Sequence, residues 1–307
     1  MSQYPGVDAE GFIQSLPDQP LQPVFSPLVD ELCAMLSRRF AALLDGLYLY
    51  GSVARGDARP GTSDLDVTLV LAWAPSPEER LRLEETRREL EARHPQVSKI
   101  DFDIGVLSEV LAPDNRYRWG FWLKHQCRCI WGNDLGLRFE PFRPSRTIAQ
   151  ALNGDFPQVL EGYAQQLEQS REPLQQQRLQ RAAARKALRS ANLLRGEQER
   201  GWPTTLEEHA QLLSAAEPGM AEYAAFFLKQ AYVPQGSVSE FVQRLRAYSA
   251  LLAGKALRIE RPICRNGWSM ARDRIGLLRR MTLGYRGQAS LLQRLGVLLP
   301  RPGMVLC

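Results

Sequence analysis

YGSVARGDARPGTSDLDVTLVL (residues 50–71) carries the most informative pattern in this chain of 307 residues. Gly51 and Ser52 directly follow a short apolar run, and a turn-rich stretch then leads to Asp64, Asp66 and a second apolar run. Apolar runs bounded by glycine and other turn residues are typical of buried strands. The segment therefore predicts two strands joined by a turn that has room for one short helix.

Two carboxylates share one face of the second strand, which we expect over residues 64–72. Side chains at positions i and i+2 of a strand point the same way, so Asp64 and Asp66 lie together while Leu65 and Val67 turn to the core. Two like charges side by side are unfavourable unless a cation binds between them. The pair therefore indicates a cation site.

A third strand is expected over residues 97–107, VSKIDFDIGVL, where alternation puts Asp101 and Asp103 on the face opposite the apolar residues. Neighbouring strands lie about 4.8 Å apart. If this strand pairs beside the second, Asp101 can complete a cluster with Asp64 and Asp66. Asp103 faces the same way, and the pattern leaves open which of the two is the third carboxylate.

Three such carboxylates suit magnesium, which prefers hard oxygen ligands. Two magnesium ions about 3.5–4 Å apart can hold the attacking and leaving oxygens of a displacement at phosphorus. Gly51 allows a ligand to approach the backbone closely, and we expect Ser52 to cap a short helix at residues 53–57 whose free N–H groups bind a triphosphate. Arg55 either contacts that triphosphate or pairs with Asp57. These features predict ATP or another NTP as substrate, with two magnesium ions as cofactor.

The segment resembles the signature of the DNA polymerase β-like nucleotidyltransferase superfamily, Gly-Ser followed by Asp-x-Asp. It is closest to the bacterial minimal nucleotidyltransferases and the aminoglycoside adenylyltransferases. KIDFDIGV resembles the family strand with the third acid, and CIWGNDL resembles the phrase that closes the catalytic domain. The similarity covers about residues 45–135, and the gap between Gly-Ser and Asp-x-Asp is one residue longer than usual. The resemblance implies that the triphosphate is held by Gly51 and Ser52 and the metals by Asp64, Asp66 and, as the better match, Asp101.

The chain as a whole predicts an α+β fold: a nucleotidyltransferase catalytic domain with a small mixed sheet at residues 1–144, then an all-helical domain at residues 145–307. In the first part we expect helices at 29–44, 76–93 and near 115–125, with strands at 47–50 and 127–131 beside the two above. In the second part we expect helices at 155–170, 174–199, 205–216, 219–232, 237–257 and 286–298.

Charge is divided unevenly between the two parts. Residues 1–144 hold 16 Lys and Arg against 21 Asp and Glu, a net of −5, and residues 145–307 hold 23 against 13, a net of +10. A basic domain suits polyanions, although a general preference for arginine would give the same count. One helical stripe, with Lys186 beside it, either binds phosphates or is a solvated face: Arg178, Arg181, Arg185 and Arg189.

The chain reads as cytoplasmic and not bound to a membrane. No apolar run approaches the ~20 residues of a membrane-spanning helix, and the N-terminus has no pattern of a secretory signal. The five cysteines are an odd set, which favours free thiols in a reducing compartment. The three histidines show no triad or metal-ligand spacing.

The sequence thus predicts an enzyme, a magnesium-dependent nucleotidyltransferase that moves a nucleoside monophosphate, AMP from ATP by preference, to an acceptor hydroxyl. A small molecule such as an aminoglycoside is one acceptor class, and RNA, tRNA or a partner protein is the alternative. A catalytically inactive nucleotide-binding regulator is a third interpretation. The acceptor and the oligomeric state are not given by the sequence.

Overall fold

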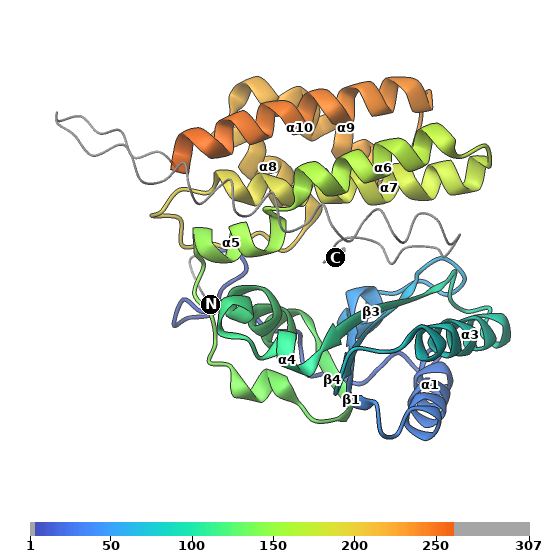
Figure 1. Ribbon diagram of the computed structural model, residues 1–307. Helices are drawn as coiled ribbons and strands as arrows, with labels where there is room; N and C mark the ends of the chain where they lie inside the picture. The colour runs from blue at the N-terminus through green and yellow to red at the C-terminus, as the bar shows by residue number, and fades with distance from the viewer. Residues whose placement is uncertain (1–3, 261–307) are drawn as a thin grey trace.

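A four-stranded mixed sheet with the strand order β3-β2-β1-β4 lies in the first part of the computed structural model, which describes residues 4–260 (Figure 1). Strand β1 is antiparallel to both β2 and β4, and β2 is parallel to β3. The predicted α+β fold is confirmed, and β3 lies beside β2, which is the condition for Asp101 to join Asp64 and Asp66. The bounds are Leu44–Tyr50 for β1, Leu65–Leu71 for β2, Ile100–Val106 for β3 and Arg128–Gly132 for β4.

Apolar side chains alternate along these strands and build a core on each face of the sheet. On one face, Leu47 and Val67 pack with residues of α1 (Ser26–Arg39) and α3 (Pro77–Arg93). On the other face, Tyr48 and Val70 pack with Trp119 and Trp122. The second strand is buried along its whole length, as expected of a strand between two neighbours that is covered on both faces.

The first part departs from the predicted bounds at three places. The helix expected over 29–44 ends at Arg39, because Leu43 and Leu44 turn into the sheet core, and Gly46 lies inside β1 at a register shift. The helix expected near 115–125 is two π-type turns, Arg116–Gly120 and Trp122–Gln126. Helix α4 (Leu107–Val110) and the 3₁₀ turns Pro113–Asn115 and Leu135–Arg138 were not predicted.

Within residues 145–260 every regular element is a helix, as predicted, and these helices surround a core of their own. Helix α5, at Arg146–Asn153, was missed. The helix expected to reach residue 199 ends at Ser190, because the buried Arg195 side chain bonds the carbonyls of Glu199 and Gly201 and turns the chain. The others are α6 Phe156–Gln169, α7 Pro173–Ser190, α8 Leu206–Ala216, α9 Ala221–Tyr232 and α10 Val238–Glu260, with 3₁₀ turns at Ala191–Leu194 and Pro218–Met220.

The helix predicted at 286–298 lies outside the described residues, and the division at 144/145 stays a prediction. A small aromatic core joins the two parts: Val7 and Ile13 pack with Phe121 of the first part and Trp202 of the second. The backbone N–H of Trp202 also donates to the carbonyl of Pro5, 2.9 Å away. These contacts hold the helical layer over the sheet (Figure 1). No helix in the part of the chain described here is long and apolar enough to cross a membrane.

Candidate active site

The parallel pairing of β2 with β3 gathers the predicted acidic residues at one end of the sheet. Asp66 is the register partner of Asp101, and Thr68 is the partner of Asp103. Asp64 directly precedes β2. The sheet therefore places Asp64, Asp66 and Asp101 together, and it sets Asp103 one step further along the strand.

Gly51 faces this cluster from the end of β1, where helix α2 (Gly51–Arg55) begins. Its φ of 71° lies in the region that glycine adopts without strain. A Cβ at this position would overlap a carboxylate oxygen of Asp66 and lie 3.0 Å from its Cγ. Only a glycine lets the backbone come this close to the carboxylate.

Asp66 is the buried member of the cluster, with 9% of its surface exposed. Burial raises its pKa to about 7, and repulsion from Asp101 and Asp64 adds to that change. A carboxyl in such surroundings is stabilised as an anion only by nearby positive charge. The chemistry of the donor set therefore fits a hard divalent cation.

Neighbouring side chains contact Asp64, Asp101 and Asp103. The Ser98 hydroxyl donates to Asp64, and the Lys99 ammonium donates to Asp101 and lies 3.4 Å from Asp64 Oδ2. The Tyr50 hydroxyl donates to Asp103. With these contacts in place, residues 4–260 contain no three His, Cys, Asp or Glu side chains arranged as ligands of one ion.

At α2, the expectation that Ser52 caps a helix is wrong, and the role of Arg55 stays open. Ser52 does not cap a helix at 53–57: α2 starts one residue before it, at Gly51, and the helix has no side-chain cap. The Arg55 guanidinium lies 3.4 Å from Asp57, which was the alternative to a triphosphate contact. Both groups are largely exposed, and exposed pairs of this kind contribute little stability.

The comparisons with known proteins agree with this geometry. Residues 29–103 match the family model described as the nucleotidyltransferase domain, a range that contains β1, β2, the first part of β3 and the acidic cluster. The chain therefore contains a nucleotidyltransferase domain.

Among the solved structures that resemble this chain in fold is spectinomycin adenyltransferase AAD(9) from Enterococcus faecialis, with ATP and spectinomycin. The TM-score is 0.50 and the identity 12%, and the match covers 73% of this chain and 98% of that one. At this identity the likeness supports a common fold, helical part included. No curated protein sequence matches the chain.

Sequence reasoning missed three residues that contact the predicted acidic side chains: Tyr50 at Asp103, and Ser98 and Lys99 at the cluster. A signal for one of them was present. Lys99 precedes Asp101 by two residues, the spacing that puts side chains on the same face of an extended chain. The other two depend on pairing between strands, which the sequence alone does not specify.

The candidates on α7 divide into a buried residue and a more accessible stripe. Lys186 is 2% exposed; its ammonium lies 2.8 Å from Asp155 Oδ1 and 3.3 Å from the Leu152 carbonyl oxygen. It is therefore enclosed in the helical part, and burial lowers its pKa. Arg189 lies close enough to the buried His209 to help lower the pKa of that imidazole.

Arg181, one of the four arginines of the α7 stripe, interacts electrostatically with Asp64 of the acidic cluster. Burial and Arg185 lower its pKa, and Asp64 acts against that change, so the guanidinium lies within electrostatic reach of the cluster. Arg185 has a buried Nε without a hydrogen-bond partner among the described residues. Figure 1 shows α7 on the side of the helical layer that is nearer the sheet.

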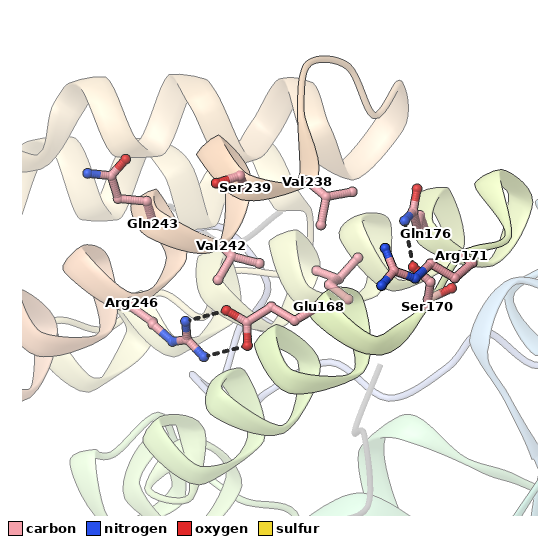
Figure 2. Close-up of a pocket in the computed structure, with 10 residues that line it drawn as sticks. Glu168, Ser170, Arg171, Gln176, Val238, Ser239, Val242, Gln243 and Arg246 are labelled. Atoms are coloured by element: carbon pink, nitrogen blue, oxygen red, sulfur yellow. Dashed lines mark hydrogen bonds and ion pairs between the residues drawn. The ribbon is translucent and has the colours of Figure 1, made fainter.

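A separate groove of about 610 Å³ lies between α6 and α10 (Figure 2). Two of its charged residues are paired: Arg246 contacts Glu168 at 2.6 Å and, beside the groove, Arg246 also contacts Glu161 at 2.8 Å. None of the acidic residues of the cluster lines it. The groove is therefore distinct from the candidate active site.

Proposed function

We propose that this nucleotidyltransferase transfers AMP from ATP to an acceptor hydroxyl, with magnesium bound at Asp64, Asp66 and Asp101. The observation that carries the proposal is the register of β2 and β3, which pairs Asp66 with Asp101 where Gly51 lets the backbone approach the Asp66 carboxylate. Repulsion from neighbouring carboxylates makes the ionised form of the buried Asp66 unfavourable. A cation bound at the cluster would offset this repulsion.

The nucleotide would lie against α2 and the end of β1. Gly51 brings the backbone close to the cluster, and the Ser52 hydroxyl has no capping role and can therefore bind a phosphate oxygen. Bound at the three carboxylates, magnesium would supply charge neutralisation for the phosphate oxygens. Positioning and charge compensation account for most of the catalysis in phosphoryl transfer.

The acceptor hydroxyl would be oriented by Asp101, whose side chain is one-third exposed at the rim of the cluster. A bond forms between the acceptor oxygen and the α-phosphorus, and the bond from that phosphorus to the bridging oxygen breaks, so that pyrophosphate leaves. The hydroxyl proton passes by way of Asp101 to solvent. The products are the adenylylated acceptor and pyrophosphate.

A small-molecule acceptor and the choice of ATP are supported by the fold match. The spectinomycin adenyltransferase structure was determined with ATP and spectinomycin, and the match covers 98% of that chain. A helical layer over the nucleotide site can enclose a compact acceptor. An aminoglycoside is the first compound class to test.

RNA is the second candidate acceptor, and a specific observation favours it. The stripe of α7 that lies within electrostatic reach of Asp64 presents arginine, and within residues 4–260 the buried Nε of Arg185 has no hydrogen-bond partner. Guanidinium groups bind phosphates well, whereas a polycationic acceptor is better matched by carboxylates. The arginines of α7 therefore favour an acceptor that carries phosphates and ends in a hydroxyl, as RNA does.

The deciding experiment is incubation of the protein with magnesium and each α-labelled NTP, with an aminoglycoside panel, total RNA or cell lysate as acceptor. The Asp64→Ala/Asp66→Ala variant is the control. Label that moves from ATP to one acceptor class, and only with the intact cluster, supports the proposal and identifies the acceptor. Nucleotide binding without transfer or pyrophosphate release to any acceptor would instead support a regulatory module.

A further inference from the structure

Lys99 is a basic side chain in direct contact with the acidic cluster, and it lies where two strands meet. Its ammonium donates to Asp101 and lies 3.4 Å from Asp64 Oδ2. These are two of the three carboxylates to which the proposed function assigns magnesium. One side chain thus bridges the two more exposed acids of the cluster, while Asp66 lies buried behind them.

The backbone holds Lys99 at this position. The N–H of Leu65 donates to the Lys99 carbonyl at 2.9 Å, and the N–H of Ser98 donates to the Ser63 carbonyl at 2.9 Å. The Ser98 hydroxyl also donates to Asp64. These bonds hold the backbone of Lys99 beside the start of β2. Only the Lys99 side chain can therefore move away from the carboxylates.

The Lys99 side chain is 31% exposed, and each of its two acidic partners is 33% exposed. A flexible four-carbon chain with this access to solvent can move its charge by changing rotamers. The ammonium and a divalent cation compete for the same oxygens, because both are attracted by the same negative charge and repel each other.

We propose that Lys99 is a displaceable counter-ion of the metal site: it neutralises Asp64 and Asp101 until a divalent cation takes its place. The inference rests on the proposed magnesium site and goes beyond it, since it makes metal entry an exchange of one cation for another. Lys99 is in this respect a positioning residue, which acts through the carboxylates.

Other charged groups that face the cluster do not supply this neutralisation. Asp103 adds negative charge, which contributes to raising the pKa of Asp66. Arg181 reaches Asp64 from α7 by electrostatic attraction, but no hydrogen bond or ion pair between them is formed in residues 4–260. Lys99 is in direct contact with the acids.

The first test measures Mn²⁺ binding in the absence of nucleotide, by the electron paramagnetic resonance signal of the free ion. Lys99→Met keeps the length of the side chain and removes its charge, so Mn²⁺ should bind about tenfold more tightly, or ~1.4 kcal/mol. Lys99→Arg should bind as the wild type does. The matched control is Lys255→Met, which breaks the ion pair with Glu217 far from the cluster and should leave affinity unchanged.

Unchanged or weaker Mn²⁺ binding by folded Lys99→Met would overturn the proposal. A second measurement uses the wild-type chain and does not depend on any variant: acetylation of lysines by a soluble ester, mapped by mass spectrometry with and without Mn²⁺. Displacement predicts that Mn²⁺ increases acetylation at Lys99 and not at Lys255. Labelling of Lys99 that stays constant or falls when Mn²⁺ is added would contradict the exchange.

These outcomes are separate from those of the transfer assay. Tighter Mn²⁺ binding by Lys99→Met together with no transfer to any acceptor would retain the counter-ion role and reject the proposed reaction. Transfer by the wild type together with unchanged metal affinity in Lys99→Met would retain the reaction and reject the counter-ion.

Discussion

Gly51 and Asp66 approach so closely that a methyl group on the glycine would overlap the carboxylate. Because the glycine also has a φ of 71°, two independent physical constraints select the same residue. The end of β1 therefore packs directly against the buried Asp66 of β2. The residues proposed to bind the nucleotide and those proposed to bind the metal are thus in contact.

We expect Gly51→Ala to lose transfer activity by ~100-fold or more, because the side chain must displace Asp66 from the cluster. Gly61→Ala is the matched control: Gly61 has a φ of 74°, and a Cβ there meets nothing within 4 Å. Both variants carry the same backbone strain, of ~1 kcal/mol. Steady-state kinetics together with urea unfolding separates strain from collision, and equal losses in the two variants would contradict the argument.

Asp101 rather than Asp103 is expected to be the third functional carboxylate. Asp101 pairs in register with Asp66, whereas Asp103 pairs with Thr68 and accepts a hydrogen bond from the Tyr50 hydroxyl. Asp101→Asn should lower kcat by ~1000-fold, an effect of ~4 kcal/mol at the transition state. Asp103→Asn should lower it by no more than ~10-fold, and the reverse order of the two effects would assign the third acid to Asp103.

The part of the fold that the sequence predicted well is the part with strict periodicity. Alternation along 64–72 and 97–107 put the acids on one face, and the helix expected over 76–93 begins at Pro77, after a capping box at Ser76. The π-type turns at 116–126 have no such local pattern, since their conformation depends on Trp119 and Trp122 packing against the sheet. Contacts remote in the sequence decide them.

The net charge of the helical part indicated its binding properties less well than the positions of its individual arginines. Of the net charge of +10 in residues 145–307, residues 145–260 supply only +2, with 14 Lys and Arg against 12 Asp and Glu. What matters in the described part is which arginines have acidic partners, and this follows from packing. Arg246 lies between Glu161 and Glu168, whereas Arg181 on α7 lies within electrostatic reach of Asp64.

Lys186 is expected to affect stability and not nucleotide binding. Its buried ammonium depends on Asp155, which is itself 40% exposed. Asp155→Ala leaves a buried ammonium without its carboxylate partner and should cost ~3–5 kcal/mol, whereas Lys186→Met leaves an acid that water can solvate and should cost less. Chemical denaturation measures both. A higher KM for ATP in Lys186→Met at unchanged stability would instead make Lys186 a phosphate ligand.

The stability of the metal-free protein should depend on pH through Asp66. Its folded pKa is raised from 3.8 to about 7, so between these values the folded chain holds a proton that the unfolded chain has lost. The free energy of unfolding contributed by this group therefore falls as pH rises through that range and is level above it. Urea unfolding in EDTA should show Asp66→Asn gaining stability relative to wild type over the same interval, and parallel curves would exclude the raised pKa.

The arginines of α7 should decide how strongly an anionic substrate binds. If Arg181 and Arg185 contact phosphates of an RNA acceptor, their joint replacement by alanine should weaken RNA binding and reduce the dependence of log Kd on log salt by ~1.4, or ~0.7 for each phosphate of a single strand that is no longer neutralised. Arg246→Ala, which removes an arginine already paired with two glutamates, is the control. Filter binding at several salt concentrations measures the slope. A raised KM for ATP with no change in RNA binding would assign the two arginines to the triphosphate, and no change in either would make the stripe a solvated face, because neither substrate then places a phosphate against it.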